Sequence, residues 1–305
     1  MIANQLALIR REIWEHRSIY VTPAAIAVIV TLATLAMLLF AGGFAKELDV
    51  AIFGAQNLAG DAERQVALTG FFIGTSWLFL FALAILTVFY TLDSLYAERK
   101  DKSILFWRSL PITDAETVLS KLLTALVVIP LVAVIAIIAT HIVNLIITSL
   151  WVSAKGGDAG HLIWGSVPLL DNWLSALVVV LASAIWMSPF IGWFLFVSAF
   201  TKRSPLLMAF MPLVVLPLVE LIFLRSTVFF EAVFTRRGMM PLFRGMDMSE
   251  FFDEDRLRVN EEAVSLLSYL DIGQFLSSPS MWAGVLVCGL LTTAAIYVRR
   301  YRDES

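Results

Sequence analysis

Three polar residues stand inside long apolar runs, where a polar side chain must find a partner or line a path. Glu220 lies in LPLVELIFL, and His141 and Asn144 lie three residues apart in IIATHIVNLII. A carboxylate at the centre of a membrane helix costs about 2.5–3.5 kcal/mol on insertion scales, so it needs a partner, a proton or water. We therefore consider Glu220, His141 and Asn144 candidates for a translocation path. The alternative is that they form hydrogen bonds between helices.

Motifs for catalysis on this chain are missing. No Gly-x-x-x-x-Gly-Lys-Ser/Thr loop is present to cradle nucleotide phosphates, so any ATP chemistry must come from a partner. No His-Glu-x-x-His pair occurs, and the single cysteine cannot form a cysteine-rich metal site. We expect no catalytic residues, no metal site and no cofactor on the chain. The rival from another class is an intramembrane hydrolase that uses His141 with Glu220 or Glu261.

A charged connection between two apolar runs carries a compact apolar patch made of Ile104, Leu105, Phe106 and Trp107. We expect this patch to lie on a short surface helix over about Ser103–Leu110, which Pro111 ends. Beyond it, Thr113 and Glu116 fit a capping box that begins the next helix. An exposed aromatic patch indicates docking of a partner. The alternative is a membrane anchor at headgroup level. About ten strongly polar residues separate the patch from the preceding apolar run, which favours docking.

The elements that carry these residues are predicted by hydropathy. The chain has 305 residues, of which 59% are hydrophobic and only 15% charged, which is typical of a polytopic membrane protein. A helix needs about 20 residues to cross a core of about 30 Å. Six runs are long enough, and we predict an all-α protein with spans at Ile19–Phe44, Thr69–Leu92, Leu122–Trp151, Trp173–Phe200, Leu206–Leu224 and Met281–Val298.

Basic residues predict the orientation of these spans. They gather before the first span, in the second and fourth connections, and after the last span, at Arg10, Arg11, Arg17, Arg99, Lys100, Lys102, Arg108, Lys121, Lys202, Arg203, Arg299, Arg300 and Arg302. The opposite short loops hold only Lys46, Arg64 and Lys155. The positive-inside rule therefore predicts that both termini are cytoplasmic. Span parity then places the segment Arg225–Ser280 outside.

Two further segments are predicted to lie on the membrane surfaces. Ile2, Leu6, Ile9 and Ile13 fall at helical spacing, with charged residues away from that stripe, so the N-terminus reads as an amphipathic helix on the inner leaflet. The exterior segment from residue 225 to 280 mixes short apolar runs with turn residues. We expect short helices there.

The connection after the second span also has a family resemblance. ERKDKSILFWRSLP, followed by TDAETVLSKL and a long apolar span, resembles the second cytoplasmic connection of the permease subunits of type-2 ABC exporters. In that family the short surface helix is a coupling helix that fits a cleft in a separate ATPase subunit. The layout of the whole chain is similar as well, whereas the exterior segment is longer and more acidic than a minimal member needs.

This resemblance implies a function and its partners. It implies a multi-pass permease in a bacterial plasma (inner) membrane, which works as a homodimer with two ABC ATPase subunits that bind ATP and magnesium. The contacts with the ATPase subunit would be Ile104, Leu105, Phe106, Trp107 and Arg108. We expect the lipid bilayer as surroundings and no nucleic-acid partner. A non-transporting membrane anchor or sensor that recruits the ATPase is the remaining alternative, and the transported molecule cannot be read from the sequence.

Overall fold

The computed structural model describes residues 2–40, 58–109, 111–165, 167–235, 240–243 and 265–301. These residues are almost entirely helical, with one isolated antiparallel bridge between Phe243 and Leu270. Six described helical segments are long and apolar enough to cross a membrane: Ser18–Phe40, Leu68–Lys100, Asp114–Ala154, Gly160–Trp186, Pro205–Leu224 and Pro279–Tyr301. The predicted class, an all-α polytopic membrane protein, is therefore confirmed.

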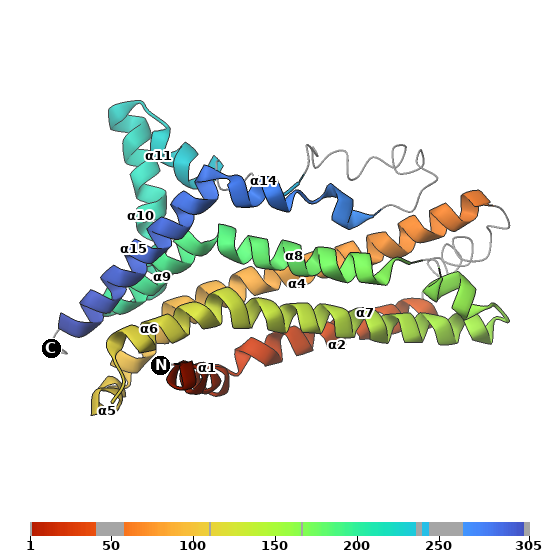
Figure 1. The fold of residues 1–305 in the computed structure, drawn as a ribbon, viewed down its shortest axis with the longest axis horizontal. Helices are drawn as coiled ribbons and strands as arrows, with labels where there is room; N and C mark the ends of the chain where they lie inside the picture. Colours follow the sequence, from red (N-terminus) through yellow and green to blue (C-terminus); the bar gives the residue numbers. More distant parts are fainter. Residues whose placement is uncertain are drawn as a thin grey trace.

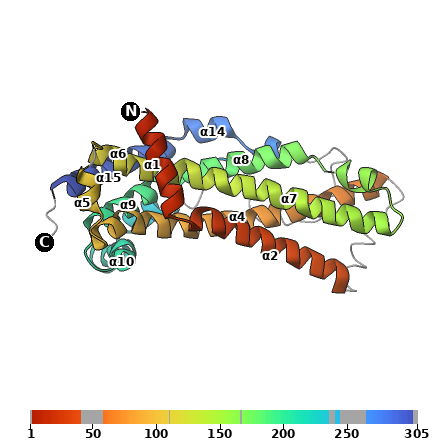
Figure 2. The same cartoon turned by 90° about the horizontal axis from the view of Figure 1, so that it is seen from below.

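The first helix, α1 (Ile2–Glu15), lies across the end of the bundle and meets α2 (Ser18–Phe40) at a sharp corner (Figure 2). Leu8 and Glu12 are one turn apart on α1 and both are buried, on the face that packs against α6 (Asp114–Leu123). Leu6 and Trp14 lie on the other side and remain exposed. The helix is thus amphipathic with a polar residue inside its packed face.

Two long helical segments run along the length of the bundle (Figure 1). One is α4 (Leu58–Lys100), and the other begins as α6 and continues through a π-helical turn, η1 (Thr124–Val128), into α7 (Ile129–Ala154). At 1.5 Å per residue, the 43 residues of α4 extend about 64 Å, roughly twice the thickness of a bilayer core. Both segments must therefore project beyond the membrane.

The fourth predicted span, Trp173–Phe200, is not one helix. It is divided at Met187 into α8 (Leu169–Trp186) and α9 (Ser188–Phe200), and a short π-helix, η2 (Gly160–Trp164), precedes α8. Pro189 explains the break, because its ring blocks the backbone hydrogen bond and the space that a continuous helix would need. The predicted span therefore corresponds to two shorter helices.

The fifth span, α10 (Pro205–Val219), packs on α9 and on the end of α4, and it ends in the π-helical turn η3 (Glu220–Leu224), which points away from the long helices (Figure 1). Ala209 is the one buried residue of α10. The described parts of residues 225–280 include the short helices α11 (Val228–Phe230), η4 (Glu231–Thr235), η6 (Leu266–Tyr269) and α14 (Ile272–Ser277).

The last helix, α15 (Pro279–Tyr301), packs most closely against α9. A Cβ atom added at Gly192 of α9 would lie 3.0 Å from the backbone of Cys288 on α15, so a larger residue there would require the two helices to shift apart by a few tenths of an ångström. The start of α1 and the C-terminal end of α15 lie at the same end of the bundle as α5 (Ile104–Ser109), whereas the end of α2, the start of α4 and the end of α7 lie at the opposite end (Figure 1).

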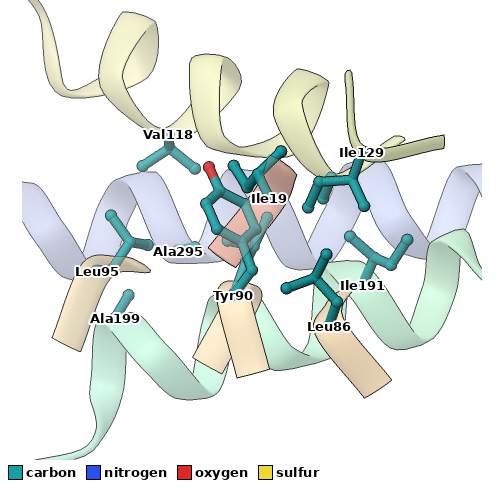
Figure 3. Packing of buried hydrophobic residues seen from close by; sticks show 11 residues of the cluster. Ile19, Leu86, Tyr90, Leu95, Val118, Ile129, Ile191, Ala199 and Ala295 are labelled. Atoms are coloured by element: carbon teal, nitrogen blue, oxygen red, sulfur yellow. The ribbon is translucent and has the colours of Figure 1, made fainter. Parts of the chain in front are cut away.

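The main apolar cluster lies where helices from the whole chain meet (Figure 3). It joins Ile19 of α2, Val118 of α6, Ile191 of α9 and Ala295 of α15 around Tyr90 of α4. Tyr90 is buried, and its hydroxyl points toward α6 (Figure 3). That hydroxyl donates a hydrogen bond to Glu12 of α1, so the apolar cluster borders a group of buried charged side chains.

Candidate functional site

The surface helix α5 joins the ends of α4 and α6. Lys102 adopts a left-handed conformation with φ of 57°, which turns the chain away from α4. The capping box predicted beyond Pro111 is confirmed, because the Glu116 amide donates to Thr113 Oγ1 at 3.1 Å and the Thr113 amide donates to the Glu116 carboxylate at 2.9 Å. The chain around α5 is therefore fixed by local turn and cap geometry.

The apolar patch on α5 has two faces. Ile104 is 2% exposed and points inward, whereas Phe106 is 59% exposed. Trp107 is half-buried and contacts Phe106 edge to face, with 5.1 Å between ring centroids. Residues three apart on a helix share a face, which explains why Ile104 and Trp107 turn inward together. The side chains of Leu105 and Arg108, and all of Leu110, lie outside the described residues.

Trp107 is held by a residue from the other end of the sequence. The guanidinium carbon of Arg11 lies 3.5 Å from the centroid of the Trp107 ring. The same guanidinium donates to Glu98 at 2.9 Å and to Glu15 at 3.0 Å. Arg11 therefore links the surface helix to a buried carboxylate at the end of α4.

Glu98 is the centre of an ion network that ties four helices together. Its carboxylate pairs with Arg11 of α1 at 2.9 Å, Lys121 of α6 at 3.0 Å and Arg299 of α15 at 2.6 Å. Glu98, Lys121 and Arg299 are all buried. Three bases from three helices therefore converge on one carboxylate of a fourth.

Two more acids complete this network. Glu12 accepts from Lys121 at 2.8 Å and from the Tyr90 hydroxyl at 2.9 Å, and Asp114 accepts from Arg299 at 2.9 Å. The ion network thus consists of three acids and three bases: Arg11, Glu12, Glu98, Asp114, Lys121 and Arg299. The formal charges of these six residues cancel, and Glu15, which also pairs with Arg11, is partly exposed to solvent. A balanced arrangement is required, since an unpaired buried charge is very costly.

This network was not predicted from the sequence. Arg11, Lys121 and Arg299 were interpreted there only as bases that predict the orientation of the spans. The available signal was the position of Glu12 and Glu98, two acids near the ends of apolar runs among those bases. Glu12 pairs with Lys121, and Glu98 pairs with Arg11 and Arg299, in each case across more than 80 residues of sequence. Spacing along the chain does not reveal pairs that far apart.

One titratable group borders this network outside the spans. His16 lies at the corner between α1 and α2, edge to face with Tyr90 at 4.9 Å. Burial lowers the pKa of His16, and the Glu12 carboxylate 3.8 Å away opposes that shift only in part. A neutral imidazole is therefore favoured at this corner.

His141 and Asn144 lie on one face of α7, as predicted, and both are buried. His141 Nε2 lies 2.8 Å from Thr75 Oγ1 of α4, and its ring packs on Phe72 with 4.4 Å between centroids. Asn144 donates to the Thr140 carbonyl at 2.8 Å. The contacts of His141 join α4 to α7, which is the alternative considered for this pair, whereas the Asn144 bond to Thr140 stays within α7 and a longer one, at 3.5 Å, reaches Thr31 of α2. A role in a translocation path stays a prediction.

Glu220 is placed at the end of α10, where it holds the following turn. Its carboxylate accepts from the Phe229 amide at 2.9 Å and from the Ser226 hydroxyl at 3.0 Å. Arg225, with φ of 47°, reverses the chain so that these donors face back toward the carboxylate. Glu220 therefore has a local structural role, and its place in a transport path also stays a prediction.

The groups proposed for a hydrolase are not assembled in the described residues. The contacts of His141 are with α4, those of Glu220 are with the turn after α10, and α7 and α10 lie on different sides of the bundle (Figure 1). Glu261 lies outside the described residues. Within the described ranges, no group of three or more His, Cys, Asp or Glu side chains is placed to hold a metal ion.

Comparison with known proteins adds no assignment. Neither protein-family models, nor curated proteins, nor solved structures gave a significant match to the chain.

Proposed function

We propose that this chain is the membrane-spanning permease subunit of an ATP-driven exporter of the type-2 ABC class. The observation that carries the proposal is α5, a short helix between the second and third spans. Its Phe106 side chain is exposed, while the neighbouring Trp107 ring is held in place by the stacked guanidinium of Arg11. A large exposed aromatic on a rigid support is the form that an interface anchor takes. The start of α1 and the end of α15 lie at the end of the bundle that carries α5, which in this proposal is the cytoplasmic side of a bacterial inner membrane (Figure 1).

In this proposal the chain performs no chemical step. Two permease copies bind two ATPase subunits, which hold ATP and magnesium. ATP binding closes the ATPase pair, α5 moves with it, and the spans change the side to which a central path opens. Nucleotide binding thus biases a two-state bundle through differential contacts in the two states.

The test is co-purification with a matched control. The tagged chain is isolated from its native membrane in mild detergent, and bound proteins are quantified by mass spectrometry together with ATP hydrolysis. We expect a protein with a phosphate-binding loop in equimolar amount, and we expect Phe106→Ala to reduce its share at least tenfold, since such anchors often contribute 2 kcal/mol or more.

The control is Phe223→Ala, because Phe223 is an exposed aromatic on the turn that ends α10, away from α5. It should leave the bound share unchanged. Absence of any phosphate-loop protein with the wild-type chain would refute the proposal. An ATPase that binds but whose hydrolysis never changes with the permease present would favour the anchor or sensor instead.

A further inference from the structure

The contacts of Arg11 form a continuous path from the surface of α5 to the interior of the bundle. Phe106 contacts Trp107, Trp107 stacks on Arg11, and Arg11 pairs with Glu98. Each step is within direct contact distance. The exposed residue of α5 is therefore connected to the centre of the ion network through two side chains.

From Glu98 the path divides into the ends of three spans. Glu98 lies in the last turn of α4, Lys121 in the last turn of α6, which continues into α7, and Arg299 in the last turn of α15. Because Lys121 and Arg299 are almost fully buried and charged, neither can lose its partner without a large cost. A displacement of Arg11 therefore changes the position of Glu98, and through its ion pairs it affects the ends of all three spans.

Arg11 is chemically suited to this position. A guanidinium is planar, so it can stack on an indole ring with its face while its edge donates to carboxylates. Lysine can supply the charge but not the planar stack. Arg11 also pairs with Glu15 on its own helix, which aligns the guanidinium along α1.

We propose that Arg11 is a positioning residue: it holds Trp107, and with it α5, in register with the ends of α4, α6 and α15 through Glu98. This assignment rests on the proposed function for its biological purpose, but its structural content does not need the ATPase. In the complex, Arg11 transmits the movement of α5 to the spans. In the isolated chain, it keeps α5 ordered.

Hydrogen–deuterium exchange on the isolated chain in detergent tests this directly. The readout is deuterium uptake in peptides that cover residues 101–112, compared with peptides from α8. We expect Arg11→Met to speed uptake in the 101–112 peptides several-fold and to leave α8 unchanged. Arg11→Lys should restore part of the protection, because it keeps the pair with Glu98 and loses the stack on Trp107.

The matched control is Arg10→Met. Arg10 is the preceding residue of the same helix, and it stacks on the exposed ring of Trp14 with 4.6 Å to the centroid. The substitution removes the same charge and a comparable cation–π contact without touching the network. It should leave uptake in residues 101–112 at the wild-type rate.

A double substitution decides whether Arg11 acts through Trp107. If it does, Arg11→Met combined with Trp107→Leu exchanges no faster than the worse single variant. Additive effects, or unchanged uptake at residues 101–112 with a lowered melting temperature, would overturn the proposal and leave Arg11 a general stabiliser. These outcomes are independent of co-purification, so a failure of the proposed function is recognised separately.

Discussion

Within the ion network, Lys121 is the residue whose charge we expect to matter most for stability. Its ammonium is fully buried between Glu12 at 2.8 Å and Glu98 at 3.0 Å. Lys121→Met keeps the length of the side chain and removes the charge, leaving buried carboxylates undercompensated. We expect a loss of about 3–5 kcal/mol, the usual cost of removing one partner of a buried pair. The measurement is the apparent melting temperature in detergent.

Two further variants show that the loss is electrostatic. Lys155→Met removes an exposed lysine at the end of α7 and should leave the melting temperature close to that of the wild type. Adding Glu12→Gln to Lys121→Met removes the surplus negative charge while retaining an acceptor for Tyr90. It should recover part of the loss. A double variant less stable than Lys121→Met would show that packing, not charge balance, governs the site.

At the scale of the elements, the tightest contact is that between α9 and α15. Gly192→Ala places a Cβ 3.0 Å from both the Cα and the carbonyl oxygen of Cys288. Backbone atoms cannot move aside as a flexible side chain does, so the two helices must separate. We expect a destabilisation of about 1–3 kcal/mol, typical of an overpacked core, seen as a lower melting temperature.

The control for this contact is a glycine in open surroundings. Gly74 on α4 has no atom within 4 Å of an added Cβ, and Gly74→Ala should be neutral or stabilising because alanine favours the helix. Truncating the cysteine in Gly192→Ala/Cys288→Ala should not restore stability, because the clash is with the backbone. Full rescue by that change would contradict the contact as described.

At the scale of the whole molecule, the proposed topology predicts which ends of the bundle react with a membrane-impermeant thiol reagent. Ser109 on α5 and Ser153 at the end of α7 are both exposed, and the natural Cys288 is buried. We expect Ser153→Cys to react in intact cells, and Ser109→Cys to react only after the membrane is opened. The reverse pattern would invert the orientation, and equal labelling of both would contradict a membrane between them.

Features that depend on residues close together in the chain were predicted from the sequence. Contacts between residues far apart in the chain were missed. Apolar run length predicted the polytopic class, and Thr113 with Glu116 predicted a cap, because both signals are local. The break at Met187 was missed because Pro189 is compatible with a bent span as well as with two helices. The partners of Glu98 were missed because Arg11 and Arg299 lie at opposite ends of the sequence. Glu220 was predicted to line a translocation path because it lies inside an apolar run. Its hydrogen bonds to the following turn were missed because they depend on the chain reversal at Arg225.

The pairing of Arg299 with Glu98 and Asp114 also bears on how the protein is made. Glu98 and Arg299 are 201 residues apart, so at about 5–20 residues per second the ribosome adds the arginine roughly 10 to 40 s after the glutamate. Until then the cluster contains three acids and two bases, and it carries an uncompensated negative charge. A nascent or truncated chain without α15 cannot close this cluster. Synthesis of α15 is thereby linked to burial of the cluster, which makes a physical difference between chains that carry α15 and chains that do not yet carry it.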